Sequence, residues 1–139
     1  MKEIEISYNS GTLSATLFDD NSNKTILIIA SATGVKQEYY FKFAKYVEKK
    51  GVTVITFDYN GIGRSLKKPI KEIKTNAADW GINDLESVIK YVINNYPKSK
   101  KVILGHSIGG QLIGLSKSSS KLDKIVLVAA QSGYWKYWK

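Results

Sequence analysis

Val102-Ile103-Leu104-Gly105-His106-Ser107-Ile108-Gly109-Gly110 is the stretch that decides how this chain folds. A continuous apolar run followed by glycines is typical of a buried strand that turns sharply into a helix. The G-x-S-x-G pattern centred on Ser107 is, in this strand–turn–helix context, typical of a nucleophile elbow. In such a turn the serine backbone is strained, and a Cβ at Gly105 or Gly109 would collide with neighbouring backbone. The stretch therefore predicts a nucleophilic Ser107, with the Ile108 N–H at the start of the helix placed to hold an oxyanion.

A nucleophilic serine needs a general base, which is normally a histidine oriented by a carboxylate. The only histidine in the chain is His106, and adjacent residues in a sharp turn point apart. No acid is found for a triad either. Three carboxylates, Asp79, Asp84 and Glu86, are expected at or in a helix whose charges face water, and Asp123 precedes its strand rather than following it. We therefore expect the base and the acid to be missing from these 139 residues.

Composition predicts one globular domain spanning residues 1–139, with 43% hydrophobic residues. The chain has no cysteine and a single histidine, which argues against disulfides, thiolate chemistry and a zinc site, and no cofactor or metal is expected. No apolar run approaches the roughly 20 residues of a transmembrane helix. No apolar stretch follows the N-terminal charges as in a signal peptide, so we expect a cytoplasmic location and no membrane span.

The net charge of +9 raises the alternative of a nucleic-acid binder. Arg64 is the only arginine, so the other 20 of the 21 basic residues are lysines. Specific recognition of phosphates and bases relies on the guanidinium fork, so no nucleic-acid partner is expected. Solvated lysine faces explain the charge, and non-specific attraction to anionic surfaces or substrates stays open.

Hydrophobic periodicity predicts alternating strands and helices after an N-terminal hairpin. This order requires a mostly parallel sheet with right-handed crossovers and helices on both faces. Asn76 is expected to cap its helix with Asp79 as partner, and Ser118-Ser119-Ser120 is expected to end the last helix. The expected hairpin strands are 2–7 and 12–18; the buried strands are 25–30, 52–59, 101–105 and 124–130; the helices are 37–50, 76–96 and 107–117.

Two loops follow buried strands and have alternative interpretations. Ser31-Ala32-Thr33-Gly34-Val35 lies where a hydrolase sheet supplies its second oxyanion donor, but an ordinary strand-to-helix loop fits equally well. Asp58-Tyr59-Asn60-Gly61-Ile62-Gly63-Arg64-Ser65 has part of a dinucleotide-loop pattern, but it lacks the third glycine, and a turn-making role is favoured. The turn at Ser107 is not a phosphate loop, because a Rossmann loop needs glycine there and a P-loop needs Gly-Lys after the turn.

The chain from Leu27 to Trp138 resembles a bacterial group of α/β-hydrolases, because four of its motifs occur in the same order as in that family. The resemblance implies Ser107 as nucleophile, with oxyanion N–H groups at Ile108 and at Ala32 or Thr33. It also implies a small-molecule acyl substrate, no cofactor, and the strand order 1-2-4-3-5-6. The residues that carry it are Ala32-Thr33-Gly34-Val35, Asp58-Tyr59-x-Gly61-Ile62-Gly63-Arg64-Ser65, Gly105-His106-Ser107-Ile108-Gly109-Gly110-Gln111 and Ala129-Ala130-Gln131-Ser132-Gly133-Tyr134-Trp135.

The chain departs from that family in length and at Asn60, where the resemblance leads us to expect arginine. Family members are about twice as long, with a lid starting near Tyr134 and two further strands that carry the acid and the histidine. We therefore expect a three-layer α/β-hydrolase-like core, truncated after the sixth strand, that is a serine hydrolase by type but incomplete and inactive as this chain alone. The strand at 124–130 would be an exposed edge, which with Tyr134–Lys139 offers a surface for self-association. The alternative is a non-catalytic binding module or truncated gene product that uses this half-hydrolase core.

Overall fold

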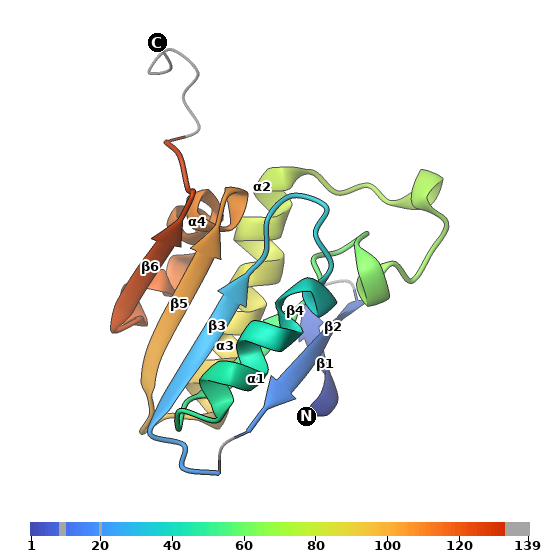
Figure 1. Ribbon diagram of the computed structural model, residues 1–139. Helices are drawn as coiled ribbons and strands as arrows, with labels where there is room; N and C mark the ends of the chain where they lie inside the picture. The colour runs from blue at the N-terminus through green and yellow to red at the C-terminus, as the bar shows by residue number, and fades with distance from the viewer. Residues whose placement is uncertain (9–10, 20, 133–139) are drawn as a thin grey trace.

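A single six-stranded sheet runs through the protein in the order β1-β2-β4-β3-β5-β6. The computed structural model describes residues 1–8, 11–19 and 21–132 (Figure 1). β1 and β2 form an antiparallel hairpin, β2 pairs antiparallel with β4, and the other pairs are parallel. This is the order that the sequence predicts, and the fold class is confirmed. The strands are β1 (Lys2–Tyr8), β2 (Gly11–Phe18), β3 (Thr25–Ala30), β4 (Thr53–Phe57), β5 (Lys100–His106) and β6 (Lys124–Val128).

Helices cover both faces of the sheet and give it three layers. Figure 1 shows α1 (Phe41–Glu48) in front of the sheet and α3 (Glu86–Asn95) behind it. The alternating side chains of β3 divide between the two faces, because successive residues of a strand point to opposite sides. Ile26 and Ile28 join the cluster around α3, whereas Leu27 and Ile29 join the cluster around α1. β3 is thus buried on both faces of the sheet, as its continuous hydrophobic run predicts.

The helix predicted over 76–96 starts where the sequence places it but is not continuous. Asn76 and Asp79 form a capping box: the Asn76 Oδ1 accepts the Asp79 N–H at 3.1 Å, and the Asp79 Oδ2 accepts the Asn76 N–H at 3.0 Å. After α2 (Ala77–Asp79) the chain widens into a π-helical segment, Trp80–Leu85, before α3. Gly81 lies in this segment, and a Cβ there would be 2.8 Å from the Leu115 Cβ. Close packing against the chain after α4 therefore accompanies the departure from α-helical geometry.

Two other helices are shorter than the sequence predicts. The segment predicted as a helix over 37–50 opens with a 3₁₀ turn, Gln37–Tyr40, and α1 ends at Glu48. The last predicted helix is limited to α4 (Ile108–Leu112), followed by a 3₁₀ turn, Ile113–Leu115. The three serines at 118–120 do not break the structure, because they lie in a further 3₁₀ helix, Lys117–Lys121.

The expectation that Asp84 and Glu86 face water is wrong. Asp84 is 1% exposed, and its Oδ2 accepts the Asn60 backbone N–H at 2.8 Å. Glu86 is 7% exposed, and its carboxylate accepts hydrogen bonds from the Ser118 N–H and Oγ, both at 2.8 Å. Both carboxylates fasten α3 and the segment before it to distant backbone. Helical periodicity cannot reveal this role, because the partners lie 24 and 32 residues away.

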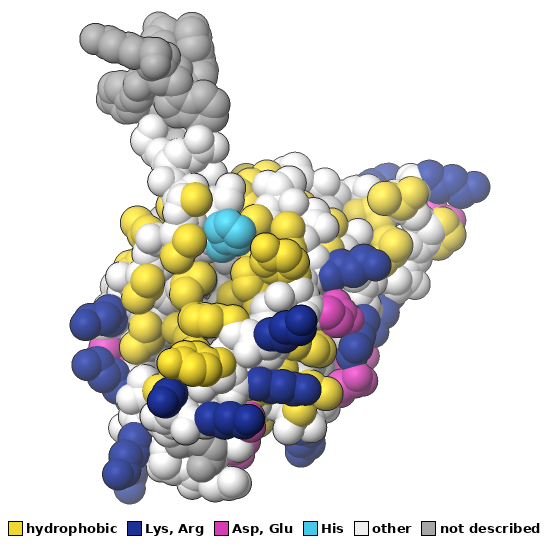
Figure 2. Space-filling view, in the orientation of Figure 1, with side chains coloured by type: hydrophobic (Ala, Val, Ile, Leu, Met, Phe, Trp, Pro, Cys, Tyr) yellow, Lys and Arg dark blue, Asp and Glu magenta, His cyan; other side chains and the backbone are white. Residues whose placement is uncertain are grey.

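The strand predicted as buried over 124–130 is exposed along its whole length. β6 has only β5 beside it, and its apolar side chains Ile125, Val126, Leu127 and Val128 are 39–59% exposed. α1 packs on β2, β3 and β4 instead, so the same face of β5 is only half-covered and that of β6 is open, and Figure 2 shows apolar side chains gathered there. The expected exposed sheet edge is therefore present. Among the described residues, no helix is both long and apolar enough to span a membrane.

Candidate active site

Ser107 lies at the sharp turn between β5 and α4 with a backbone conformation that L-residues rarely adopt. Its φ is 52° and its ψ is −119°, and it is the residue before the first turn of α4. The Ser107 N–H donates to the Val128 carbonyl at 2.9 Å, and the Ser107 carbonyl accepts the Gly110 N–H at 3.0 Å. The backbone on both sides of the strained residue is thus held in place. This is the geometry of an elbow that lifts a side chain out of the sheet.

Glycines make this turn possible by allowing backbones to come very close together. A Cβ on Gly109 would lie 2.2 Å from the Ala30 carbonyl oxygen, at the end of β3. A Cβ on Gly105 would lie 2.5 Å from the Gly110 Cα. Real Cβ atoms essentially never make contacts under 3.0 Å. A side chain at either glycine would therefore collide with neighbouring backbone, as the G-x-S-x-G pattern predicts.

His106 is directed to the α1 side of the turn, where Tyr40 holds it. Its Nδ1 and the Tyr40 hydroxyl are 2.9 Å apart, and the two rings meet edge to face with centroids 6.0 Å apart. Burial raises the pKa of Tyr40, so the hydroxyl stays protonated. The imidazole nitrogen that faces Tyr40 is thus already hydrogen-bonded. The sequence gives no signal for this partner, because Tyr40 lies 66 residues before His106.

The Tyr40 hydroxyl also distinguishes the two candidates for the second oxyanion donor. It accepts the Ala32 backbone N–H at 3.0 Å, so that donor is already used within the protein. Thr33 is exposed at the same strand end, and it precedes Gly34, whose φ of +69° turns the chain. Of the two residues, Ala32 is therefore buried with its N–H bonded to Tyr40, whereas Thr33 is open to solvent. The Ile108 N–H lies in the first turn of α4, where backbone donors have no partner within the helix.

The loop that follows β4 has the turn-making role that the sequence favours. Asp58 is 1% exposed and accepts three N–H groups, from the Gln37 backbone at 2.8 Å, the Gln37 side chain at 2.9 Å and the Arg64 backbone at 3.0 Å. A Cβ on Gly63 would lie 2.6 Å from this carboxylate. Ser65 donates to the Asp58 carbonyl at 2.7 Å and accepts the Ser14 N–H at 2.9 Å. The motif thus joins β2, β4 and the 3₁₀ turn before α1.

A second buried cluster lies beneath the same loop, around Asp84. Burial raises the pKa of Asp84 to about 7, and the hydrogen bond from the Asn60 N–H only partly offsets this effect. Trp80 stacks on Tyr59 with centroids 5.1 Å apart, and its Nε1 donates to the Asn60 carbonyl at 3.0 Å. Burial, and then the nearby Asp84, raise the pKa of Tyr59. Asp84 is buried and accepts the Asn60 backbone N–H, so it is a structural carboxyl in the described part of the chain.

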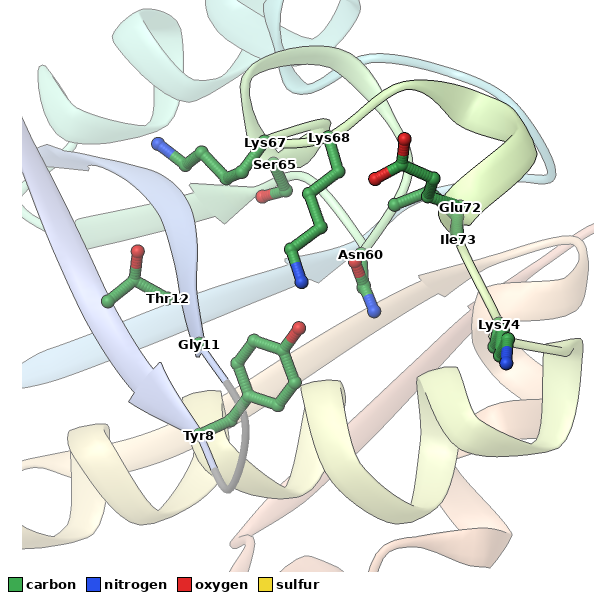
Figure 3. Close-up of a pocket in the computed structure, with 10 residues that line it drawn as sticks. All are labelled: Tyr8, Gly11, Thr12, Asn60, Ser65, Lys67, Lys68, Glu72, Ile73 and Lys74. Carbon is green, nitrogen blue, oxygen red and sulfur yellow. The ribbon is translucent and has the colours of Figure 1, made fainter.

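A cavity of about 230 Å³ lies between the β1–β2 hairpin and the loop after β4. Figure 3 shows the Lys68 ammonium group directed between the Tyr8 hydroxyl and the Asn60 side chain, while Lys67 extends the other way. Lys74 also lines the cavity, and Glu72 is the one carboxylate among the described residues that line it. A cation beside a hydroxyl and an amide suits an anionic group. Ser107 does not line this cavity.

Residues 21–138 match the family described as serine aminopeptidase, S33, and the chain belongs to this family of α/β-hydrolases. The curated relatives include a proline iminopeptidase from Thermoplasma volcanium, 31% identical over 93 residues, which are 67% of this chain and 29% of the relative. The mouse phospholipase ABHD3 is 28% identical over 136 residues, which are 95% of this chain and 32% of the relative. The chain thus spans about a third of the length of these relatives.

Solved structures share the fold. An α/β serine hydrolase without a lid from Xanthomonas campestris superposes with a TM-score of 0.75 at 15% identity, over 99% of this chain and 65% of that one. The α/β-hydrolase GrgF from Penicillium superposes with a TM-score of 0.78 at 21% identity, over 93% of this chain and 45% of that one. The resemblance stated from the sequence and the α/β-hydrolase fold class are confirmed.

We predict that Asp84→Asn stabilises the protein at neutral pH and not at acid pH. The folded-state pKa of about 7 lies above the ordinary value of 3.8, so the folded state binds more protons than the unfolded state between these values. The wild-type protein therefore loses stability as the pH rises from about 4 to about 7. Asparagine does not ionise, so the variant avoids this loss, and its Oδ1 can still accept the Asn60 N–H. At pH 8 the free energy of unfolding of Asp84→Asn should exceed that of the wild type, and this excess should be larger than the excess at pH 4 by on the order of 3 kcal/mol.

Urea denaturation followed by circular dichroism at pH 4, 6 and 8 measures this difference. Glu72→Gln removes an exposed carboxylate and is the matched control, which should show no comparable pH-dependent gain. An Asp84→Asn effect that is the same at all three pH values would contradict the assignment of a protonated buried carboxyl.

Proposed function

We propose that Ser107 is the nucleophile of an α/β-hydrolase-type serine hydrolase that cleaves ester or related acyl bonds of small molecules. The observation that carries this proposal is the positive φ of Ser107 at the start of α4, between glycines packed against backbone. The Ser107 Oγ would attack the acyl carbon and form a tetrahedral oxyanion, which the N–H groups of Ile108 and Thr33 would stabilise. Loss of the leaving group gives an acyl-enzyme, which water then hydrolyses.

Among the described residues, no side chain is placed as a general base for Ser107. His106 is the only histidine, and its Nδ1 is 2.9 Å from the Tyr40 hydroxyl on the α1 side of the turn. We propose that the base and its acid come from sequence other than these 139 residues, and that the chain alone has little activity. The relatives are named for a phospholipase and an aminopeptidase, so the proposed substrate class stays at the level of the acyl bond. The cytoplasmic location expected from the sequence is likewise a proposal.

Chemical rescue with imidazole tests this function. A fluorophosphonate probe should label the protein slowly in buffer, because nothing near Ser107 in the described chain takes its proton. Added imidazole should raise the labelling rate at least tenfold by acting as the missing general base, which typically contributes about 10²-fold or more. Ser107→Ala should abolish the imidazole-dependent part, with labelling read by intact-mass spectrometry.

Two outcomes would contradict the proposal. Equal labelling of the wild type and Ser107→Ala at every imidazole concentration would exclude Ser107 as the nucleophile. Strong Ser107-dependent labelling without imidazole would show that a base lies within these residues. Circular dichroism of Ser107→Ala shows that the variant is folded, so that a lost signal reflects the hydroxyl.

A second candidate function rests on the exposed edge strand. We propose that β6 pairs with a second copy of this chain, because its free backbone edge and its exposed Ile125, Val126 and Leu127 have no covering element among the described residues. The proposed contribution of Tyr134–Lys139 to this surface lies outside the described residues. A non-catalytic half-hydrolase core would act through the same edge.

Val126→Lys should convert a self-associating protein into a monomer, because a charged side chain on an edge strand opposes strand pairing. Sedimentation velocity between about 5 and 200 μM measures the oligomeric state, a range over which weak complexes dissociate. Ser7→Lys adds the same charge on β1, at the opposite edge of the sheet, and should leave association unchanged. A wild-type protein that is monomeric throughout this range would contradict the proposal.

A further inference from the structure

The loop after β4 holds a large share of the protein's charge. Its residues 64–74, here called the basic loop, contain five basic residues and one acidic residue, Glu72. Five minus one gives +4, against +9 for all 139 residues. The five basic residues are Arg64, Lys67, Lys68, Lys71 and Lys74.

Acidic residues elsewhere in the protein anchor the beginning of the basic loop. Arg64 pairs with Glu3 on β1, and its Nε is 2.9 Å from a Glu38 carboxylate oxygen. The Lys67 Nζ is 3.1 Å from the Glu5 carboxylate, also on β1. These two cations are therefore paired with β1 and with the turn before α1, and their charge is partly neutralised.

The remaining cations are free to meet a ligand. Within the part of the chain that the structure describes, no carboxylate lies within salt-bridge distance of Lys68, Lys71 or Lys74. Two large apolar side chains are exposed among them: Ile70 is 74% exposed and Leu66 is 41% exposed. The loop projects to the right of the sheet in Figure 1, and Figure 2 shows basic and apolar side chains side by side on this projection.

The cavity behind the projection adds a site for an anion. Lys68 extends from the basic loop into this cavity, beside the Tyr8 hydroxyl and the Asn60 amide (Figure 3). These groups come from β1 and from both parts of the loop after β4, and a cation with two hydrogen-bonding neighbours suits a phosphate group. An anion held here would lie directly behind the exposed lysines.

We propose that the basic loop docks the protein on the surface of an anionic phospholipid bilayer. Lysines near such a surface are attracted to acidic lipids, and exposed apolar side chains of the same loop gain by leaving water for the headgroup boundary. Ile70 and Leu66 enter this boundary, Lys71 and Lys74 face the headgroups, and Lys68 meets a headgroup phosphate. The proposal is independent of any chemistry at Ser107.

A bilayer fits this loop better than a nucleic acid does. Single-stranded binding relies on aromatic side chains that stack on bases, and residues 64–74 contain none. Base and phosphate recognition relies on arginine, and the one arginine is paired with two glutamates. An exposed isoleucine between lysines has no role on a phosphate backbone, whereas it is suited to a lipid interface.

Vesicle co-sedimentation tests the docking. The wild type should bind phosphatidylcholine vesicles that contain about one third phosphatidylserine, and should not bind pure phosphatidylcholine. Lys68→Gln/Lys71→Gln should weaken this binding about tenfold or more, because both lysines act near the anionic surface. The control Lys49→Gln/Lys50→Gln removes the same charge from the loop between α1 and β4, and should change binding less than about twofold. Ile70→Ser keeps every charge and should also weaken binding.

Several results would overturn the proposal. An equal loss in both double variants would mean that net charge alone drives binding. Unchanged binding of Ile70→Ser would remove the apolar contribution, and absence of binding to the anionic vesicles would remove docking altogether. Competition by millimolar inorganic phosphate would assign the cavity to a free anion, and tighter binding to single-stranded DNA than to vesicles would assign the loop to nucleic acid. Because Lys68, Lys71 and Ile70 do not anchor the loop, unaltered circular dichroism is expected for all variants.

Discussion

The close contact between α4 and the end of β3 determines the geometry of the turn at Ser107. Gly109 lies so close to the Ala30 carbonyl that a Cβ would be 2.2 Å from its oxygen. This approach leaves no room for a gradual turn out of β5, so Ser107 takes a φ of 52°. The same approach brings the start of α4 against the carboxyl end of β3, where the 31–35 loop begins. Strain at one residue is thus maintained by the packing of its neighbours.

Hydrogen bonds then decide which groups at this edge are free for chemistry. The Tyr40 hydroxyl is hydrogen-bonded to both the Ala32 N–H and the His106 imidazole. The only histidine of the chain therefore has a structural contact beside the site. Asp58 and Asp84 are used in the same way, as acceptors for the backbone of Gln37, Arg64 and Asn60. The described residues thus form the turn at Ser107 and the hydrogen bonds that hold its surroundings. In the proposed function, residues outside this chain accept the Ser107 proton.

Much of the fold was predictable because strong local signals agree with one another. The continuous apolar runs at 25–30 and 101–105 mark buried parallel strands, Asn76 with Asp79 marks a helix start, and the glycines around Ser107 mark the turn. The errors arise where contacts between distant residues decide the outcome. Asp84 and Glu86 are buried by partners 24 and 32 residues away, and Tyr40 meets His106 across 66 residues. β6 reads as buried because its sequence is apolar, although only one neighbour is present to cover it.

The free energy of unfolding of Ser107→Gly, compared with that of Ser107→Ala, shows whether the turn at Ser107 is strained. Glycine adopts a positive φ without a steric cost, whereas alanine keeps the Cβ that the turn strains. If packing around Gly109 holds Ser107 in a strained turn, the glycine variant should be more stable than the alanine variant by about 1 kcal/mol or more. It should also be at least as stable as the wild type. A glycine variant less stable than the alanine variant would show that the turn is not strained, and the account of the elbow would be wrong.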